Sequence, residues 1–331
     1  RVSYLSDQIL TNAMRRACAL ARRYLGATSP NPPVGAVALN ADGAIIAEAA
    51  HERAGAAHAE AALLHHCRTQ NILAQIHTLV VTLEPCNHHG KTLPCTQAIL
   101  DAKIKHIAIG ARDPNPDVAG GGIEYLRAQG VQVTENIALA ECEQLIAAFA
   151  TVKLHAMPWI TIKRVFDAQG SMIPPAGQKT FASPSSLLLA HRLRKKSDAI
   201  ITGSGTILAD NPLFTVRHVT DHPGKTRILA IADRRRRVPE SYRLSAESNG
   251  FQIMLFDDLT EIINELYRRG VQDILIEAGP TLSQAVFDNN FWHLYIDIEC
   301  KTEDHITAEL NPDMKIPFDP AHFHLTHLLP A

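Results

Sequence analysis

Three side chains that suit a catalytic metal ion lie between residues 58 and 95. His58 opens this stretch, and Cys86 and Cys95 close it. One histidine and two thiolates are a ligand set that Zn²⁺ takes when its fourth position is left to water. Three candidate ligands and a proline before the first cysteine rarely coincide by chance. The spacing therefore predicts a zinc site formed by His58, Cys86 and Cys95.

Glu60 follows the first candidate ligand by two positions. If His58 lies in the first turn of a helix, Glu60 stays near the metal without ligating it. H-x-E followed by P-C and a second cysteine is the signature of zinc deaminases, in which the glutamate transfers protons. Here eight residues separate the two cysteines, so the loop between them is longer than in that signature. We interpret Glu60 as the catalytic acid and base of a hydrolytic deamination.

Composition limits the class of protein. The length of 331 residues predicts about two domains, and 46% hydrophobic with 20% charged residues is typical of a globular protein. The formal net charge of −2 argues against a polynucleotide or an anionic membrane as partner. Six cysteines without a regular framework indicate a reducing, cytoplasmic compartment. No long apolar run or signal-peptide pattern occurs, so we expect neither a membrane span nor secretion.

The first half must place the metal ligands at the ends of its elements. Apolar spacing predicts a helix over 7–25, and the Asn-Ala-Asp-Gly turn at 40–43 predicts a hairpin. An apolar strand over 77–83 delivers Cys86 to its C-terminal end, and Pro94 starts a helix with Cys95 in its first turn. The remaining elements are expected as strands at 34–39, 44–50, 104–110 and 131–134 and helices at 122–129 and 138–150.

A second alternating unit follows a change of character near residues 152–159. Strands that alternate with helices indicate a parallel or mixed sheet with helices on both faces. The expected strands cover 159–165, 198–202, 227–232, 251–256, 273–277, 291–299 and 323–329, and the expected helices cover 185–195, 259–269 and 281–289. We therefore predict two α/β domains, residues 1–150 and 151–331.

The first half resembles the deaminase domain of the bifunctional deaminase/reductase family of riboflavin biosynthesis. The matching blocks are Pro30-Asn31-Pro32-Pro33-Val34-Gly35, His58-Ala59-Glu60, Glu84 to Cys95 and Asp113-Pro114-Asn115-Pro116. The resemblance implies a cytidine-deaminase-like three-layer α/β/α fold that deaminates a diaminopyrimidinone ribosylamine 5′-phosphate. It also implies Asn31 and His88 as substrate contacts; hydrogen bonds within turns are the alternative role for both residues.

The second half resembles the reductase domain of the same family. The segments that carry this resemblance are Asp198-Ala199-Ile200, Gly203, Thr206, Ala209 to Pro212, Thr215-Val216-Arg217, and Glu277 to Leu282, together with Lys163. The resemblance implies a dihydrofolate-reductase-like α/β fold. It further implies that NADPH reduces the ribosyl group of the deaminated product to a ribityl chain.

Site residues of the second half follow from that resemblance. It places the substrate at Lys163, Arg194, Arg217 and Glu277, and the cofactor at Phe181, Thr206, Asp210, Gly279, Pro280, Thr281 and Leu282. Two fixed cations suit a 5′-phosphate; an ordinary surface charge is the alternative for Arg194 and Arg217. Gly203-Ser204-Gly205 after a strand allows close approach of a pyrophosphate but is not a full dinucleotide fingerprint.

Three departures from the family pattern leave a rival interpretation open. Asp167-Ala168-Gln169-Gly170 replaces S-L-D-G, Phe181 replaces a tryptophan, and a glycine-rich strand end near 302–310 is missing. The rival is a zinc deaminase whose C-terminal domain is a non-catalytic scaffold. A nucleic-acid deaminase with an RNA-binding module is a second rival, but it requires a basic, aromatic-bearing groove, and aromatic residues are only 5%.

Four consecutive arginines, Arg234 to Arg237, stand outside these assignments. Such a run is most often a solvated turn, and a role near a cofactor phosphate is the alternative. The leading interpretation remains a cytoplasmic enzyme, expected as a homo-oligomer, that acts on a small phosphorylated pyrimidine and not on nucleic acid.

Overall fold

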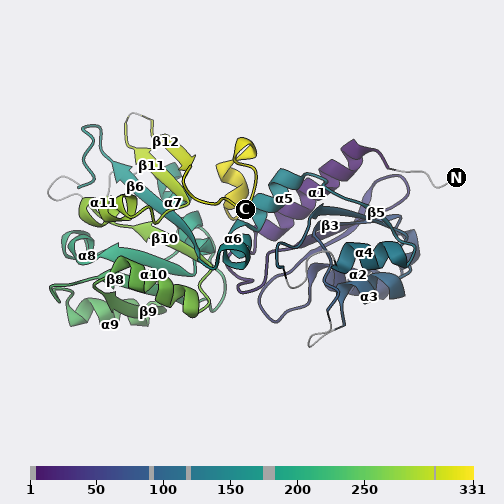
Figure 1. Cartoon of the computed structure of the whole chain (residues 1–331), viewed down its shortest axis with the longest axis horizontal. Helices are drawn as coiled ribbons and strands as arrows, with labels where there is room; N and C mark the ends of the chain where they lie inside the picture. Colours follow the sequence, from purple (N-terminus) through teal and green to yellow (C-terminus); the bar gives the residue numbers. More distant parts are fainter. Residues whose placement is uncertain (1–4, 89–92, 117–120, 174–182, 302) are drawn as a thin grey trace. The chain divides into compact units, whose positions relative to one another are not determined.

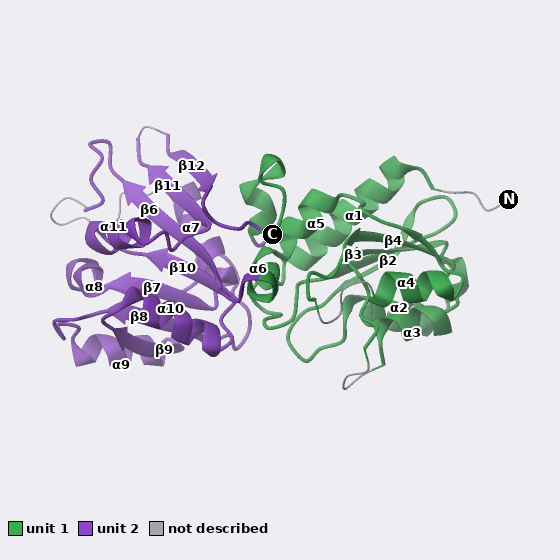
Figure 2. Ribbon diagram, in the orientation of Figure 1, with its two compact units in different colours: residues 1–154, 317–329, 331 green, residues 155–316, 330 purple. Residues whose placement is uncertain are grey.

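The computed structural model describes residues 5–88, 93–116, 121–173, 183–301 and 303–331. The chain forms two compact units, shown in green and purple in Figure 2. Unit 1 contains residues 1–154, 317–329 and 331, and unit 2 contains residues 155–316 and 330. The predicted second domain, 151–331, thus differs from unit 2 at both ends, because residues 151–154, 317–329 and 331 belong to unit 1.

Unit 1 is built on a five-stranded mixed sheet (Figure 1). Its strands are β1 (Gly35–Leu39), β2 (Ile45–Ala50), β3 (Thr78–Leu83), β4 (His106–Ala111) and β5 (Gln132–Thr134), in the order β2-β1-β3-β4-β5. The predicted hairpin is confirmed, because β1 and β2 pair antiparallel and the Asn40 side chain accepts the amides of Asp42 and Ala44. Strands β3, β4 and β5 run parallel.

Helices cover both faces of this sheet, so the predicted three-layer fold is confirmed. One hydrophobic cluster joins α1 (Asp7–Arg22) and α5 (Leu139–Leu145) to the sheet. A second cluster joins α2 (Ala59–Thr69), α3 (Cys95–Asp101) and α4 (Gly121–Ala128) to the opposite face. The predicted helix 138–150 is interrupted at Ile146, whose φ of −100° and ψ of 13° end α5 before α6 (Ala147–His155) begins.

The segment 317–329 does not contain the predicted strand. Residues 320–322 and 325–328 form short 3₁₀ helices instead. The buried Gln144 side chain donates to the His322 carbonyl at 2.8 Å and accepts from the His324 amide at 2.9 Å. Leu328 and Leu329 are buried. Side-chain hydrogen bonds from α5 therefore satisfy backbone groups that a strand would have paired with a neighbouring strand.

Unit 2 is built on a seven-stranded sheet in the order β12-β11-β6-β10-β7-β8-β9. Its strands are β6 (Trp159–Phe166), β7 (Ala199–Gly203), β8 (Arg227–Ala232), β9 (Phe251–Phe256), β10 (Asp273–Glu277), β11 (Leu294–Glu299) and β12 (His305–Leu310). All neighbours pair parallel except β11 and β12. Strand β12, which the sequence analysis did not predict, forms one edge.

The helices of unit 2 pack on opposite faces of the sheet, and the side chains of β10 contact helices on both faces. Ile274 and Ile276 belong to a hydrophobic cluster with α10 (Leu259–Arg268) and α11 (Pro280–Asp288). Asp273 and Glu277 point to the other face, since side chains alternate along a strand, and they bind α7 (Pro184–Lys196). Two shorter helices, α8 (Ser204–Asp210) and α9 (Glu240–Ser248), were not predicted. Within the described residues, no helix has the length and apolarity needed to cross a membrane.

Gly35 allows helix α1 to lie directly on strand β1. A Cβ atom at this position would lie 2.0 Å from the Ala17 carbonyl oxygen, and backbone cannot rotate away as a side chain can. We predict that Gly35→Ala destabilises unit 1 by about 1–3 kcal/mol or more through overpacking. Chemical denaturation measures this change. Gly121→Ala is the matched control, because its nearest neighbour would lie at 3.9 Å, and equal stability of the two variants would contradict the prediction.

Candidate functional site

The three predicted metal ligands converge in unit 1. His58 is the N-cap of α2, with φ −64° and ψ 156°, one position before the first turn in which it was expected. Cys86 follows β3, and Cys95 is the first residue of α3. The donor atoms of these three residues all lie within 4.8 Å of one another. Two helix starts and one strand end therefore bring the ligand set together.

The spacing of the donor atoms fits Zn²⁺. The Nδ1 atom of His58 lies 3.6 Å from the Cys86 sulfur and 3.4 Å from the Cys95 sulfur. Tetrahedral coordination with Zn–S near 2.3 Å and Zn–N near 2.0–2.1 Å separates nitrogen from sulfur by about 3.6 Å. The residues present thus satisfy both the chemistry and the dimensions of such a centre.

The two thiols differ in their protonation. The Cys95 thiol and the His58 ring lower the pKa of Cys86 to about 4 against the opposing effect of burial. The hydrogen bond to Cys86, together with burial, raises the pKa of Cys95. The Cys95 amide also donates to the Cys86 sulfur at 3.4 Å. The site therefore holds a thiolate beside a thiol, and a divalent cation would favour the thiolate of both.

Glu60 lies in the first turn of α2, next to the donor cluster. Glu60 is only 3% exposed to solvent. Burial raises the pKa of Glu60 to about 6, and the charge of Cys86 acts in the same direction, while backbone and Cys95 hydrogen bonds oppose the shift. A carboxyl group with such a pKa exchanges protons readily near neutral pH.

Asn31 contacts His51, a histidine beside the metal-ligand candidate His58 that the sequence analysis did not identify. The Asn31 amide nitrogen lies 3.3 Å from Nε2 of His51, whose Nδ1 lies 3.0 Å from the Ala57 carbonyl. These contacts place the ring proton on Nδ1 and make Nε2 an acceptor. The His51 and His58 rings meet edge to face with centroids 5.5 Å apart. His88 is exposed on the loop after Cys86.

Glu84 is a second residue that the sequence analysis treated only as part of a motif. Its buried carboxylate accepts hydrogen bonds from the amides of Asp113, Gly122 and Ile123, at 3.2, 3.0 and 3.1 Å. Glu84 thereby joins the end of β3 to the loop after β4 and to the first turn of α4. These bonds position the segment that carries Cys86.

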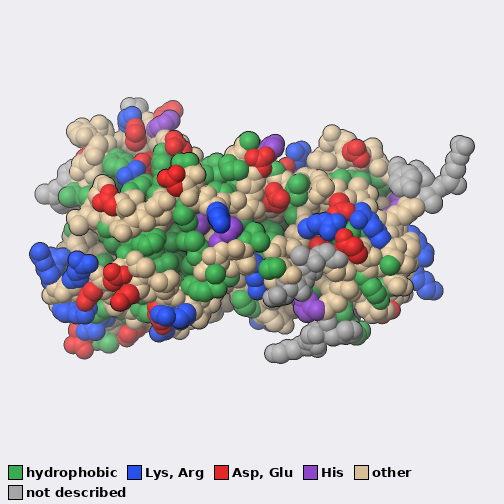
Figure 3. All heavy atoms as spheres, viewed as in Figure 1, with side chains coloured by type: hydrophobic (Ala, Val, Ile, Leu, Met, Phe, Trp, Pro, Cys, Tyr) green, Lys and Arg blue, Asp and Glu red, His purple; other side chains and the backbone are tan. Residues whose placement is uncertain are grey.

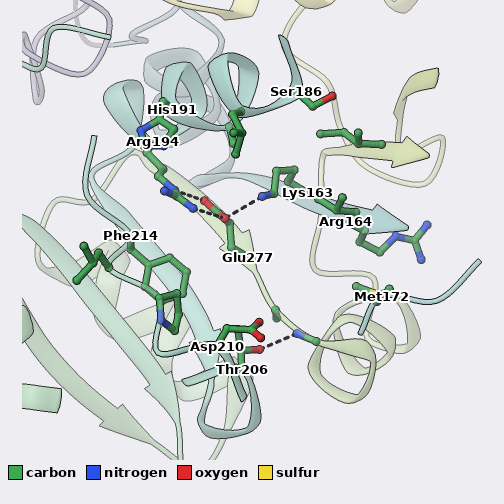
Figure 4. Close-up of a pocket in the computed structure, with 18 of the residues that line it drawn as sticks. Lys163, Arg164, Met172, Ser186, His191, Arg194, Thr206, Asp210, Phe214 and Glu277 are labelled. Atoms are coloured by element: carbon green, nitrogen blue, oxygen red, sulfur yellow. Dashed lines mark hydrogen bonds and ion pairs between the residues drawn. The ribbon is translucent and has the colours of Figure 1, made fainter. Parts of the chain in front are cut away.

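Unit 2 contains a pocket of about 410 Å³ at the C-terminal ends of β6 and β10 (Figure 4). Its lining includes seven of the predicted site residues: Lys163, Arg194, Thr206, Asp210, Arg217, Glu277 and Gly279. The first residues of α11, Pro280, Thr281 and Leu282, are not among the residues that line the pocket. Phe181 lies outside the described residues.

A buried ion cluster forms the floor of this pocket. Arg194 donates to both oxygens of Glu277 at 2.6 and 2.8 Å, and Lys163 donates to one of them at 2.8 Å (Figure 4). Burial alone would raise the pKa of Glu277, but Arg194 and Lys163 outweigh it and hold that pKa far below its usual range. Arg194 is therefore no ordinary surface charge. Two cations on one carboxylate leave positive charge for an anionic ligand.

Three of the predicted cofactor residues, Thr206, Asp210 and Gly279, line this pocket. The Thr206 hydroxyl accepts from the Gly279 amide at 3.0 Å, which joins α8 to the start of α11. The Asp210 side chain points toward Thr206 (Figure 4), and burial raises its pKa. The Thr206–Gly279 contact joins α8 to the turn after β10.

His191 positions Arg217 and was also missed from the sequence. Its Nδ1 accepts from the Arg217 amide at 2.8 Å, and its ring meets that of His218 with centroids 4.5 Å apart. Burial, followed by the charge of Arg194, lowers the pKa of His191 to about 4, so the ring is neutral at neutral pH. A single histidine inside a helix carries no spacing signal that could have predicted this contact.

Comparison with known proteins identifies both units. The model of the cytidine and deoxycytidylate deaminase zinc-binding region matches residues 7–111, and that of the RibD C-terminal domain matches residues 158–295. The riboflavin biosynthesis protein RibD of Aquifex aeolicus is 35% identical over 82% of this chain and 75% of its own length. The Escherichia coli RibD is 32% identical over 82% of both chains.

A solved structure agrees over nearly the whole chain. The diaminohydroxyphosphoribosylaminopyrimidine deaminase/5-amino-6-(5-phosphoribosylamino)uracil reductase of Thermotoga maritima matches with a TM-score of 0.79 and 29% identity. The match covers 88% of this chain and 87% of that one.

Fold and site together define a zinc-type deaminase domain joined to a reductase domain. The chain belongs to the RibD family of riboflavin biosynthesis proteins. The predicted fold class and the predicted pairing of deaminase with reductase are confirmed.

The charge on Glu277 should contribute to stability in a pH-dependent way. Because its folded pKa is lowered, that contribution is complete above the unfolded pKa of about 4.3 and is lost as pH falls toward the folded pKa. We predict that Glu277→Gln lowers the free energy of unfolding by about 3–5 kcal/mol at neutral pH. The difference from wild type should shrink below about pH 4.

Urea denaturation between pH 7 and pH 3 measures both quantities. Glu265→Gln on α10 is the control, because Glu265 forms only surface ion pairs with Arg268 and Arg269 and should change stability little. A loss for Glu277→Gln that is as small as the control's would show that the ion cluster does not stabilise the fold.

Proposed function

We propose that this enzyme catalyses two consecutive steps of riboflavin biosynthesis. Unit 1 deaminates 2,5-diamino-6-ribosylamino-4(3H)-pyrimidinone 5′-phosphate, and unit 2 uses NADPH to reduce the ribosyl group of the product to a ribityl chain. The observation that carries the first step is the convergence of one imidazole, two thiols and the buried Glu60. The name of the Thermotoga maritima relative supports the substrate.

His58, Cys86 and Cys95 are the proposed zinc ligands. Their donor distances support this assignment, and the fourth position is left to water. When bound, Zn²⁺ would lower the pKa of that water, and the water would then be a nucleophile at neutral pH.

Glu60 is the proposed proton carrier of the deamination. Its carboxylate accepts a proton from the attacking water and delivers it to the ring nitrogen next to the amino-bearing carbon. The same group then takes the second proton of that water, from the new hydroxyl on the ring carbon, and gives it to the amino group, which leaves as ammonia. A pKa near 6 suits both roles, since neither the acid nor the base form is rare at neutral pH. Asn31, held by His51, and His88 are the proposed substrate contacts.

The reductase step is assigned to the pocket of unit 2. When bound, NADPH would supply a hydride to the anomeric carbon of the ribosylamino group, while the bond from that carbon to the ring oxygen breaks and the ring oxygen takes up a proton. Lys163, Arg194, Arg217 and Glu277 are the proposed substrate contacts, and the net positive charge of this cluster favours the 5′-phosphate. The proposed cofactor contacts are Phe181, Thr206, Asp210, Gly279, Pro280, Thr281 and Leu282. The presence of this buried ion cluster in the pocket supports an active reductase over a scaffold.

The proposal also includes the cellular compartment and the oligomeric state. None of the six cysteines forms a disulfide, which supports a reducing, cytoplasmic compartment. Strand β12 ends the sheet of unit 2 with Ile306 exposed, and such an edge supports a homo-oligomer. Light scattering of the purified chain would decide the second point, and a monomeric mass would contradict it. We propose a small-molecule substrate and no nucleic-acid partner.

Glu60→Gln should separate metal binding from catalysis. The amide keeps the shape of the side chain but cannot carry the proton, so we predict normal zinc content and a loss of deamination of about 10²–10⁴-fold or more. Metal analysis and ammonia release measure the two effects. Cys86→Ser is the contrasting variant and should lose zinc together with activity. Near-normal activity of Glu60→Gln would contradict the role of Glu60.

A coupled assay tests the whole proposal. Ammonia release and NADPH absorbance are followed together after the diaminopyrimidinone ribosylamine phosphate is added to the purified chain. We predict that ammonia release precedes the consumption of NADPH, because reduction acts on the deaminated product. Ammonia release without any consumption of NADPH would reject the reductase activity and favour the scaffold.

A further inference from the structure

Residues 211–217 lie between α8 and β8 and form part of the pocket wall in unit 2, and we term them the strap. The residues of the strap that line the pocket are Asn211, Pro212, Leu213, Phe214 and Arg217. The backbone of the strap is strained, because Asn211 has a φ of 45° and Phe214 has a φ of 55°. Asparagine tolerates this left-handed region, whereas a bulky residue such as phenylalanine adopts it only at an energetic cost. Other contacts must therefore hold Phe214 in this conformation.

One of these contacts comes from Tyr242 on α9. Its hydroxyl donates to the Pro212 carbonyl at 2.7 Å. Tyr242 and Ala246 are the buried residues of α9, whereas Figure 3 shows charged side chains at the part of the surface where Figure 1 labels this helix. Burial raises the pKa of Tyr242 to about 12, so the hydroxyl keeps its proton and remains a donor at neutral pH. Tyr242 does not occur among the described residues that line the pocket, so it can act on a ligand only through the strap.

Helix α7 holds the other end of the strap. Phe214 is 2% exposed to solvent, and its ring centroid lies 5.6 Å from the guanidinium carbon of Arg194 (Figure 4). Arg194 also donates to the Thr215 carbonyl at 3.4 Å, and His191 accepts the Arg217 amide at 2.8 Å. The Arg217 side chain donates to the Thr215 hydroxyl at 2.5 Å. The strap thus contacts or contains both arginines to which the substrate phosphate is assigned.

We propose that the strap holds these two arginines at the spacing that the substrate 5′-phosphate requires, and that Tyr242 is the positioning residue that fixes the strap. This inference rests on the proposed reductase function. The Tyr242 hydroxyl fixes Pro212, two residues before the strained Phe214, and Phe214 in turn packs against Arg194. Without this hydrogen bond the strap can relax toward an unstrained backbone, and the guanidinium groups are no longer organised for the phosphate before it binds. The substrate then binds more weakly.

Tyr242→Phe in the full chain tests this role, with Tyr267→Phe on α10 as the matched control. Each variant removes one tyrosine hydroxyl from a helix of unit 2, but the Tyr267 hydroxyl has no hydrogen-bond partner among the described residues. Tyr242→Phe should raise the KM of the reductase for the deaminated substrate about three- to tenfold, the value of one hydrogen bond between neutral groups. Its kcat should stay nearly unchanged, because the lost interaction serves binding and not hydride transfer. Tyr267→Phe should change neither constant.

Three further measurements locate the effect within the chain. Ribose 5-phosphate, which carries the phosphate but no pyrimidine, should inhibit Tyr242→Phe less well than wild type. The Kd for NADPH from fluorescence titration should be the same for both proteins, because the Thr206–Gly279 contact holds α8 independently of the strap. Ammonia release by unit 1 should also be unchanged. Unchanged NADPH binding and ammonia release show that both units of the variant are folded.

A second pair of variants tests the strap at α7. His191→Asn keeps a side-chain acceptor for the Arg217 amide, whereas His191→Leu removes it. The KM for the substrate should rise in His191→Leu and stay closer to the wild-type value in His191→Asn. A loss of packing alone would raise the KM equally in both variants.

The possible outcomes separate this inference from the proposed function. An unchanged KM in Tyr242→Phe, or an equal loss of affinity for substrate and for NADPH, would overturn the positioning role while leaving the reductase proposal intact. If Tyr242→Phe does not fold, equal KM values for His191→Asn and His191→Leu would overturn it. A wild-type chain that consumes no NADPH would overturn the inference and the reductase proposal together.

Discussion

A carboxylate that stays charged in a buried position organises unit 2. Glu277 can do so only because Arg194 and Lys163 bind both of its oxygens. These contacts tie β10 to β6 and to α7, so the same interaction fixes the sheet, the helix above it and the pocket floor. A buried pair of this kind is weak evidence for net stability, but removal of one partner leaves an uncompensated buried charge, which is strongly destabilising. The pocket floor is therefore polar and already held together by ion pairs without a ligand.

Unit 1 also buries a glutamate, but backbone amides stabilise it in place of positively charged side chains. Glu84 is buried, and three backbone amides satisfy it, which locks the loops on either side of the metal ligands. Glu60 lacks a comparable set of amide donors, and burial keeps its pKa raised. Two buried glutamates of one domain thus differ in role because one is fully hydrogen-bonded and the other is left free to exchange protons.

Residues that belong to a motif of fixed spacing could be predicted from the sequence. Residues whose role depends on contacts between distant parts of the chain could not. His58, Cys86 and Cys95 were found because their chemistry is explicit at fixed intervals. His51, Glu84 and His191 are single residues whose partners lie far away in the chain, so no local pattern marks them. Buried strands such as β3 and β10 were predicted from their apolar runs. The half-exposed β12 and the polar α9 were not, and the apolar tail at 323–329 was taken for a strand because periodicity cannot reveal a 3₁₀ turn.

The return of residues 317–329 to unit 1 has a consequence for how the chain acquires its structure. Unit 2 is inserted, in sequence, between two parts of unit 1, so the ribosome completes the reductase fold before it delivers the last piece of the deaminase fold. Until then the buried amide of Gln144 lacks two partners, and the surface that Leu328 and Leu329 cover stays open. The deaminase unit, although it is begun first, is the one that matures last. Unit 2 is one continuous segment apart from Pro330, whereas unit 1 is assembled from segments on both sides of it.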